Sequence, residues 1–224
     1  LLVSDQGLAS TGLVDRVQEL LGDSLPVQVF LAPAGEPSVN TVDEGANIAR
    51  QMDTPLIIGL GGGTALDIAK LIAGLAVSNY PMSHYLLCAN PWQGSAPKIM
   101  IPTTSGTGAE VTRTCVLADE MSNKSWAWGD ELSPELVILD PQASKSMPAV
   151  ITAATGLDAL VHAIEAATSQ STNSISAANA LQAIKLVIQN LEDSVNTPDN
   201  LEARLNMQQG AYLAGIAIDN CGTG

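Results

Sequence analysis

Three consecutive glycines follow a short apolar run in the stretch LIIGLGGGTALDIAK, residues 56–70, and precede a helical pattern. Glycine has no Cβ, so backbone N–H groups there can approach an anion closely, and the N-terminus of the following helix carries partial positive charge. Pyrophosphate is the anion that this arrangement would bind. Thr64 could cap the helix or donate its hydroxyl to a phosphate, while Asp67 and Lys70 lie one and two turns further on. The alternative is a tight turn without a ligand, since neither GxGxxG nor the P-loop pattern is present.

A second polar cluster follows another apolar run, in IPTTSGTGAEVTRT at residues 101–114. Four hydroxyl-bearing residues lie within five positions, interleaved with two glycines: Thr103, Thr104, Ser105 and Thr107, with Gly106 and Gly108. Ligands of open parallel sheets bind outside the carboxyl ends of the strands, so we expect this loop and the glycine loop to meet there. The alternative is a capped turn that leads into a helix from Ala109.

A carboxylate stands at the end of the first apolar run, where LLVS is followed by Asp5. Asp5 could accept hydrogen bonds from ribose hydroxyls and would repel a 2′-phosphate. The local sequence fits equally well a turn residue that bonds to the backbone ahead of Gly7.

An aspartate and a histidine lie four residues apart in GLDALVHAIE, residues 156–165. On a helix, Asp158 and His162 would share one face. A carboxylate and an imidazole at that spacing can bind one divalent metal ion. The alternative is an ion pair between the two side chains, because the surrounding Ala, Leu, Val and Ile leave both polar groups in need of a partner.

Short apolar runs alternate with amphipathic stretches over the first 140 residues, which predicts parallel strands joined by helices. The predicted strands are LLVS at 1–4, VQVF at 27–30, LIIGL at 56–60, KIMI at 98–101 and LVIL at 136–139. The predicted helices cover about residues 10–21, 39–52 and 65–78, and residues 79–97 are expected to be irregular. A small β-ribbon is predicted within residues 113–131, where RTCVLA and KSWAWG flank DEMSN.

From residue 149 the pattern changes to three alanine-rich helices without a convincing strand between them. Their sequences are AVITAATGLDALVHAIEAATS, SISAANALQAIKLVIQNLEDSV and NLEARLNMQQGAYLAGIAID. The sequence therefore predicts two domains. Residues 1–144 would form a Rossmann-like α/β domain with a parallel sheet, and residues 145–224 the first part of an all-helical domain.

The composition favours an α/β or helical protein, because 46% of the 224 residues are hydrophobic and only 3% are aromatic. A net charge of −14 with nine Lys and Arg argues against a nucleic-acid surface, which needs clustered cations. No apolar run approaches the ~18 residues that would span a bilayer, so no membrane partner is expected. Three cysteines without a CxxC pair fit a reducing cytoplasm.

In this order and at these distances, the three motifs resemble those of the iron-containing (group III) alcohol dehydrogenases. GGGTALDIAK is similar to GGGS-x-x-D-x-AK, PTTSGTGAEVT to PTT-x-GTG-x-EVT, and GLDALVHAIEA to G-x-DAL-x-HAIE. The resemblance extends over nearly the whole chain. It implies a dinucleotide-binding α/β domain followed by a helical metal-binding domain, with the active site in the cleft between them.

The resemblance also implies which residues contact NAD. Gly62, Gly63 and Thr64 would contact the pyrophosphate. Asp67 would order that loop or reach the cofactor. The contacts on the adenosine and ribose side would be Thr103, Thr104 and Thr107. Asp5 would favour NAD over NADP. Lys124 would match a cofactor-contacting lysine, across a one-residue gap.

By the same resemblance, Asp158 and His162 would be two of four ligands of a metal ion, usually ferrous iron and sometimes zinc. The family takes the other two from histidines downstream of a segment like MQQGAYLAGIAIDNCGTG, which ends this chain. His84, the other histidine of this chain, matches no ligand. We therefore expect native sequence beyond Gly224, and also ahead of Leu1, where a strand begins without a lead-in.

The leading hypothesis is an oxidoreductase that transfers hydride reversibly between NAD(H) and a small alcohol or its aldehyde or ketone, with a metal ion polarising the alcohol oxygen. We expect a homo-oligomer, a dimer or larger. One alternative is a metal-free NAD(P)H reductase like the maleylacetate reductases, which usually lack this pairing of Asp and His. Another is a non-catalytic nucleotide-binding fragment, which would explain the incomplete ligand set. Sugar-phosphate cyclases of the dehydroquinate synthase type would need basic residues that we do not find.

Overall fold

The computed structural model describes residues 1–22, 25–33, 35 and 37–222 of the chain. Contacts divide the chain into two compact units. Unit 1 comprises Leu1–Ile101 and Arg113–Val137, and unit 2 comprises Pro102–Thr112 and Ile138–Gly224. The predicted boundary between residues 144 and 145 stays a prediction, because contacts within the folded chain do not test which segments fold independently.

Unit 1 is built on a five-stranded sheet in the order β2-β1-β3-β4-β7. Its strands are β1 Leu2–Asp5, β2 Val29–Ala32, β3 Ile57–Gly61, β4 Lys98–Pro102 and β7 Leu136–Val137. The pairs of β1 with β2, β1 with β3 and β4 with β7 are all parallel. Helices alternate with the strands along the chain, which confirms the predicted α/β class with a parallel sheet.

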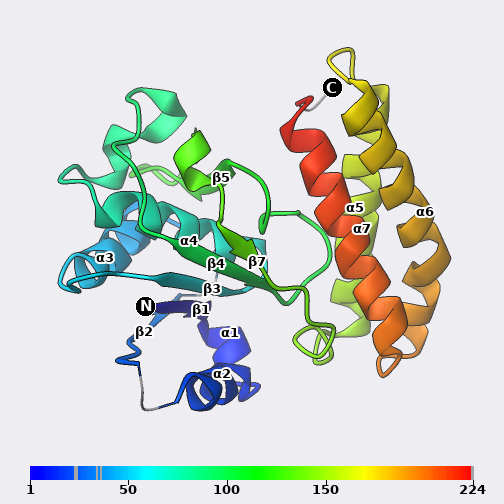
Figure 1. Cartoon of the computed structure of the whole chain (residues 1–224), viewed down its shortest axis with the longest axis horizontal. Helices are drawn as coiled ribbons and strands as arrows, with labels where there is room; N and C mark the ends of the chain where they lie inside the picture. Colours follow the sequence, from blue (N-terminus) through cyan, green and yellow to red (C-terminus); the bar gives the residue numbers. More distant parts are fainter. Residues whose placement is uncertain (23–24, 34, 36, 223–224) are drawn as a thin grey trace. The chain divides into compact units, whose positions relative to one another are not determined.

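Helices cover both faces of this sheet (Figure 1). On one face lie α1 Gln6–Ala9 and α2 Leu13–Leu21, where Val14 packs with Leu2 and Leu60 of the strands. On the other face lie α3 Val39–Ala49 and α4 Gly63–Ala76. Residues 65–75 of α4 are all buried, which explains why, apart from the paired Asp67 and Lys70, this segment is apolar on every side rather than along one stripe.

The predicted strands and helices of unit 1 are confirmed, with shifted boundaries. The strand expected at 27–30 runs from Val29 to Ala32. The helix expected from residue 10 begins at Leu13, because Gly12 adopts the left-handed conformation with φ +80° and separates α1 from α2. Residues 79–97 contain only the short 3₁₀ turns η1 Met82–His84 and η2 Leu86–Cys88, as expected for an irregular segment.

The predicted β-ribbon is present as a separate two-stranded antiparallel sheet of β5 Thr114–Ala118 and β6 Lys124–Trp128. Side chains on one face of the ribbon are buried, namely Cys115, Leu117, Ser125 and Ala127. Alternation along β6 leaves Lys124, Trp126 and Trp128 exposed on the other face. A short 3₁₀ turn, η3 Asp130–Leu132, follows.

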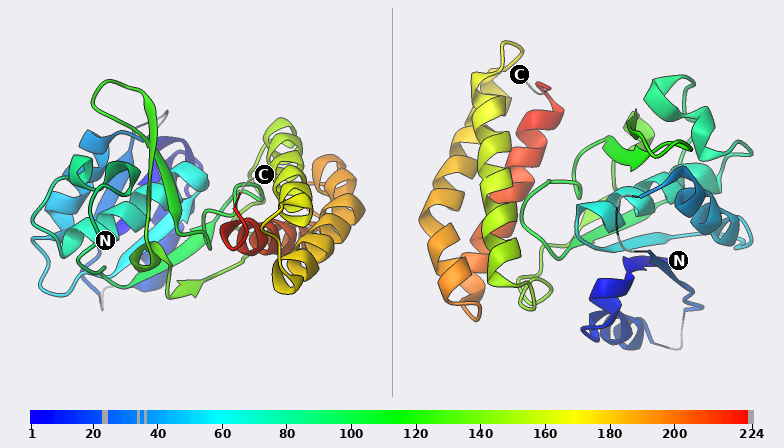
Figure 2. Two further views of the ribbon diagram at one scale, coloured as in Figure 1. Left: turned by 90° about the horizontal axis from the view of Figure 1, so that it is seen from above. Right: turned by 180° about the vertical axis from the view of Figure 1, so that it is seen from behind.

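Unit 2 contains three long helices that pack alongside one another, α5 Ala149–Thr168, α6 Ser174–Asn196 and α7 Leu201–Asp219 (Figure 2). Asn173 and Asn200 cap α6 and α7 by accepting hydrogen bonds from backbone N–H groups of the first turns. The helix interfaces consist mainly of alanines, with Val187 and Met207 among the larger buried side chains. The three predicted helices are therefore confirmed.

Among the described helices, α5 alone is long and apolar enough to cross a membrane by length and composition, with a mean hydropathy of 1.3 over its best window. The sequence contains no uninterrupted apolar run of that length, because Asp158 and Glu165 interrupt it. Core helices of soluble proteins can have the same length and composition.

Candidate functional site

The glycine loop and Asp5 come together at the point where the strand order of the sheet reverses. In the sheet, β2 lies on one side of β1, and β3, the next strand along the chain, lies on the other side. Ligands of such sheets bind outside the carboxyl ends of the strands at this point. A Cβ built on Gly61 would lie 2.6 Å from the Cβ of Ala65 and 3.3 Å from Oδ2 of Asp5. With its φ of +154° as well, Gly61 fits here only as glycine.

Helix α4 begins directly after this loop, with Gly62 as its N-cap and Gly63 as its first residue. No side chain caps it, so its first N–H groups are available to an anion. The prediction that Thr64 could cap the helix is wrong. Thr64 is the second residue of the helix, past the capping position, and it is exposed.

Asp5 has a local structural role as well as its place at the reversal point. Its Oδ1 accepts a hydrogen bond of 2.8 Å from the N–H of Leu8, which makes Asp5 the N-cap of α1. The alternative interpretation of Asp5 as a turn residue is therefore present in the structure. This cap is compatible with the interpretation of Asp5 as a ribose-binding residue. The cap uses Oδ1, whereas Oδ2 is the oxygen near Gly61.

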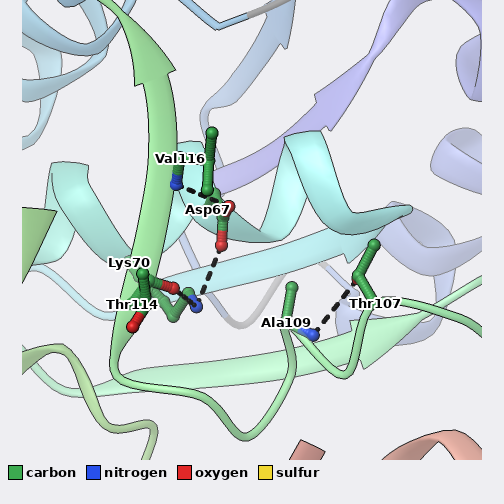
Figure 3. A network of polar contacts seen from close by, with 6 residues as sticks. All are labelled: Asp67, Lys70, Thr107, Ala109, Thr114 and Val116. Atoms are coloured by element: carbon green, nitrogen blue, oxygen red, sulfur yellow. Dashed lines mark hydrogen bonds and ion pairs between the residues drawn. The ribbon is translucent and has the colours of Figure 1, made fainter. Parts of the chain in front are cut away.

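One turn into α4, a buried ion pair ties the helix to the ribbon (Figure 3). Nζ of Lys70, which is fully buried, lies 2.9 Å from Oδ1 of Asp67 and donates to the carbonyl of Thr114 at 3.1 Å. Oδ2 of Asp67 accepts a 3.0 Å hydrogen bond from the N–H of Val116. The two side chains therefore hold the backbone of β5 against the first half of α4.

Burial and charge act in opposite directions on this cluster. Burial, the largest single effect, would lower the pKa of Lys70, but the contacts with Asp67 and Cys115 together outweigh it and hold that pKa above its ordinary value. Burial raises the pKa of the neighbouring Cys115 thiol far above its usual range. Lys70 is thus a charged ammonium paired with a carboxylate, and Cys115 is a neutral, unreactive thiol.

The threonine loop, Pro102–Thr112, belongs to unit 2, where α5 and α7 pack against it. Gln208 of α7 donates from Nε2 to the carbonyls of Pro102 at 3.3 Å and Asp140 at 3.1 Å. Thr103 and Ser105 are buried, Thr104 is partly exposed, and Oγ1 of the exposed Thr107 accepts a 3.3 Å hydrogen bond from Ala109. The alternative of a helix from Ala109 is wrong, because only a turn follows.

Two glycines allow the loop to approach α7 closely. Gly108 adopts the left-handed conformation with φ +67°, and a Cβ there would lie 2.7 Å from the Cα of Gly215 in α7. A Cβ on Gly215 would in turn lie 2.7 Å from Cγ1 of Val111 and 3.0 Å from the Cα of Gly108. The glycines of this loop therefore serve close packing within unit 2.

The Asp158 and His162 pair lies on α5 as predicted, at one helical turn of separation. His162 Nε2 and Asp158 Oδ1 are 3.7 Å apart, too far for a hydrogen bond. Nδ1 of His162 is buried and has no hydrogen-bond partner within the described part of the chain. In those same residues, no group of three or more His, Cys, Asp or Glu is placed to hold an ion.

The geometry of this pair fits two ligands of one metal ion. Two ligand atoms that each lie about 2.1 Å from an ion can be up to about 4.2 Å apart, so a separation of 3.7 Å is within that limit. Nε2 makes no hydrogen bond to Asp158 at this distance, so its lone pair can bind a cation. The buried Nδ1 would still need a partner of its own, because a cation at Nε2 does not contact it.

Lys124 is exposed at the start of β6, on the same strand face as Trp126 and Trp128.

The sequence motifs place Lys70 on a helix without assigning it a function, and they do not single out Gln208. Both residues lie in stretches that resemble the family, but neither stretch indicates what the side chain contacts. Only the packed structure shows that each side chain is buried against the backbone of another segment.

These features define a class of protein with two parts. An α/β unit carries a loop of the anion-binding type where the strand order of its sheet reverses, and a helical unit that follows in the chain carries an Asp and His pair. The family profile described as "Iron-containing alcohol dehydrogenase" matches residues 1–141, and "Fe-containing alcohol dehydrogenase family, C-terminal" matches residues 152–224. The chain belongs to the iron-containing alcohol dehydrogenase family.

Individual relatives agree with this assignment. The chain is 40% identical to "Long-chain-alcohol dehydrogenase 1" of Geobacillus thermodenitrificans over 99% of its own length and 57% of that protein. It is 34% identical to "NAD-dependent methanol dehydrogenase" of Bacillus methanolicus, covering 59% of it. Its structure is similar to sulfoacetaldehyde reductase from Bifidobacterium kashiwanohense in complex with NAD+, with a TM-score of 0.93, 32% identity, and coverage of 99% of this chain and 59% of that one. The chain thus spans somewhat more than half the length of these relatives.

Proposed function

We propose that the protein containing this chain catalyses reversible hydride transfer between NAD(H) and a small alcohol or its aldehyde or ketone. The observation that carries the proposal is the convergence of Asp5 and the Gly61–Gly63 loop at the reversal point of the parallel sheet, with the uncapped N-terminus of α4 beside them. Membership of a family of alcohol dehydrogenases supports the substrate class. A cytoplasmic location and a homo-oligomeric state are parts of the same proposal.

The residues of unit 1 would bind and orient the dinucleotide. Backbone N–H groups at Gly62 and Gly63 and the hydroxyl of Thr64 would bind the pyrophosphate, aided by the positive end of α4. Oδ2 of Asp5 would accept hydrogen bonds from a ribose. Asp67 would act by positioning, since both of its oxygens already contact Lys70 and Val116. The exposed Lys124 would supply a cation to the cofactor.

Unit 2 carries the other residues proposed for the cofactor and the metal. Thr103, Thr104 and Thr107 are the proposed contacts to the adenosine and ribose side. Asp158 and His162 would hold a divalent ion, with Fe²⁺ proposed and Zn²⁺ as the other option, because a carboxylate and an imidazole suit both metals. When bound there, the ion supplies Lewis-acid polarisation of an alcohol oxygen. No protein general base is then required at the reacting carbon.

The test is NADH formation by the full-length protein after loading with Fe²⁺ or, separately, Zn²⁺. We expect NADH from at least one short-chain alcohol or diol with one of the two metals. Failure with every such substrate and both metals would remove this substrate class. NADH binding without metal binding in calorimetry would instead favour the non-catalytic nucleotide-binding alternative.

Replacing one member of the metal pair should weaken metal binding strongly. For His162→Ala in the full-length protein, we expect a loss of at least about 100-fold in Fe²⁺ or Zn²⁺ affinity, because removing even an outer partner of a ligand costs 10-fold to 100-fold. Calorimetric titration with each metal measures it. His84→Ala is the matched control, since His84 stacks on Tyr80 at a centroid distance of 4.0 Å and is not a proposed ligand. Equal affinities of the two variants would contradict the assignment.

Removing the charge of Asp5 while keeping its cap should change cofactor choice. Asp5→Asn retains an oxygen that can accept from the N–H of Leu8, so stability should change little. We expect the preference for NADH over NADPH to fall by about fivefold to tenfold, the effect of removing a repulsion of roughly 1 kcal/mol between charges near a solvated surface. Parallel titrations with the two cofactors measure the ratio, and an unchanged ratio would exclude Asp5 from the ribose site.

A further inference from the structure

The exposed face of the ribbon in unit 1 combines aromatic and cationic side chains. Two of the three tryptophans of the chain lie on this face, where Trp126 is 42% exposed and Trp128 is 40% exposed. Lys124 lies two residues before Trp126 on the same face of β6. A lysine and a large aromatic ring side by side on an exposed strand form a surface suited to an anionic ligand that also contains a planar ring.

The two tryptophans of this face have different surroundings. The guanidinium of Arg113 lies over the ring of Trp128 at 5.1 Å from its centroid, and the same side chain forms a 2.7 Å ion pair with Asp130. The ring of Trp128 is thus already covered by a cation, whose charge is balanced by a carboxylate. Lys124 and Trp126 form the end of the face that is complementary to an anion.

Buried contacts hold the ribbon on the first half of α4, the helix that begins at the glycine loop. Val116 of β5 lies opposite Trp126 in the antiparallel register, at a cross-strand spacing of about 5 Å. Its N–H donates to Asp67, which is one helical turn from the uncapped start of α4. Trp126 is thus linked to the start of α4 through β5 and one helical turn, and all of these residues belong to unit 1.

We propose that Trp126 stacks on a planar ring of the dinucleotide bound at the glycine loop, beside the cation that Lys124 supplies in the proposed function. This inference rests on the proposed function, because it requires a dinucleotide at that loop. Charge complementarity supports the occupant: the pyrophosphate is anionic, whereas the chain as a whole carries a net charge of −14 and would repel an anion elsewhere on its surface. Trp126 would then be a binding residue that the family motifs of this chain do not include.

The test is calorimetric titration of NADH into the full-length protein and three variants. For Trp126→Ala we expect an affinity lower by roughly 5-fold to 150-fold, the range for loss of one base–aromatic stack. Trp126→Phe keeps an aromatic face and should bind within about threefold of the unmodified protein. Trp128→Ala is the matched control, with the same strand face and a similar exposure, and should retain its affinity.

The outcomes separate this inference from the function on which it rests. If the unmodified protein fails to bind NADH, both are overturned. If it binds NADH and Trp126→Ala binds equally well, only the role of Trp126 is overturned. Equal losses in Trp126→Ala and Trp128→Ala, or no rescue by Trp126→Phe, would also overturn it, because these results indicate damage to the ribbon rather than loss of a stacking ring. Circular dichroism of each variant checks that the ribbon variants are folded.

Discussion

Lys70→Met should destabilise the chain by about 3–5 kcal/mol, the cost of breaking a buried ion pair by removing one partner. Lys70 is fully buried, and its ammonium contacts the carboxylate of Asp67 and the carbonyl of Thr114. Methionine fills a similar volume but leaves the carboxylate without its counter-charge and the carbonyl without its donor. Urea unfolding at neutral pH measures the change in the free energy of unfolding.

A second substitution tests the physical reason for this loss. Asp67→Asn in the Lys70→Met background removes the uncompensated charge and keeps an oxygen for the N–H of Val116. We expect the double variant to be more stable than Lys70→Met alone. Lys145→Met is the control at an exposed pair with Asp199, 2.8 Å long, where no measurable change is expected. If Lys70→Met were as harmless as Lys145→Met, the pair would have no structural role.

Gly108→Ala should destabilise the chain by about 2–5 kcal/mol. Two costs add: roughly 1–2 kcal/mol for a left-handed conformation with a Cβ, and roughly 1–3 kcal/mol for overpacking. The overpacking arises because the new Cβ would lie 2.7 Å from the Cα of Gly215, a backbone atom that cannot rotate away. The loop would have to move off α7, so binding of NADH should weaken as well if the loop contacts the cofactor.

Gly12→Ala separates these two costs. Gly12 has a comparable φ of +80°, but a Cβ there would meet nothing within 4 Å. It should therefore lose only the conformational part, about 1–2 kcal/mol. Denaturant unfolding of the two variants gives the difference. Equal losses would show that the contact between Gly108 and Gly215 is not tight in solution.

Much of the fold could be predicted because its signals are local. The alternation of apolar runs with amphipathic stretches indicates the strands and helices of unit 1, and three long alanine-rich patterns indicate α5, α6 and α7. Errors occurred where a single residue decides. Gly12 moves the start of one predicted helix from residue 10 to Leu13. Gly62 and Gly63 begin α4 two residues early, which moves Thr64 from a capping position into the helix.

The candidate site was predictable in its residue types but not in its contacts. The motifs place Asp5, the glycine loop and the Asp158 and His162 pair correctly on their elements, because each motif is contiguous in sequence. The roles of Lys70 and Gln208 were not predictable. Their partners are carbonyls 44 and 106 residues away, and a carbonyl is present at every position of a chain.

The sequence by itself determined the class of the chain, the order of its elements and the residue types at each proposed contact, since these depend on side-chain periodicity and short motifs. Tertiary structure alone decided three features: Asp5 lies against Gly61, Asp67 and Lys70 hold the ribbon on α4, and the threonine loop packs against α5 and α7. The physical reason is that each depends on burial. A glycine, a lysine or a glutamine acquires its role from the backbone that packs against it, and that neighbour exists only in the folded chain.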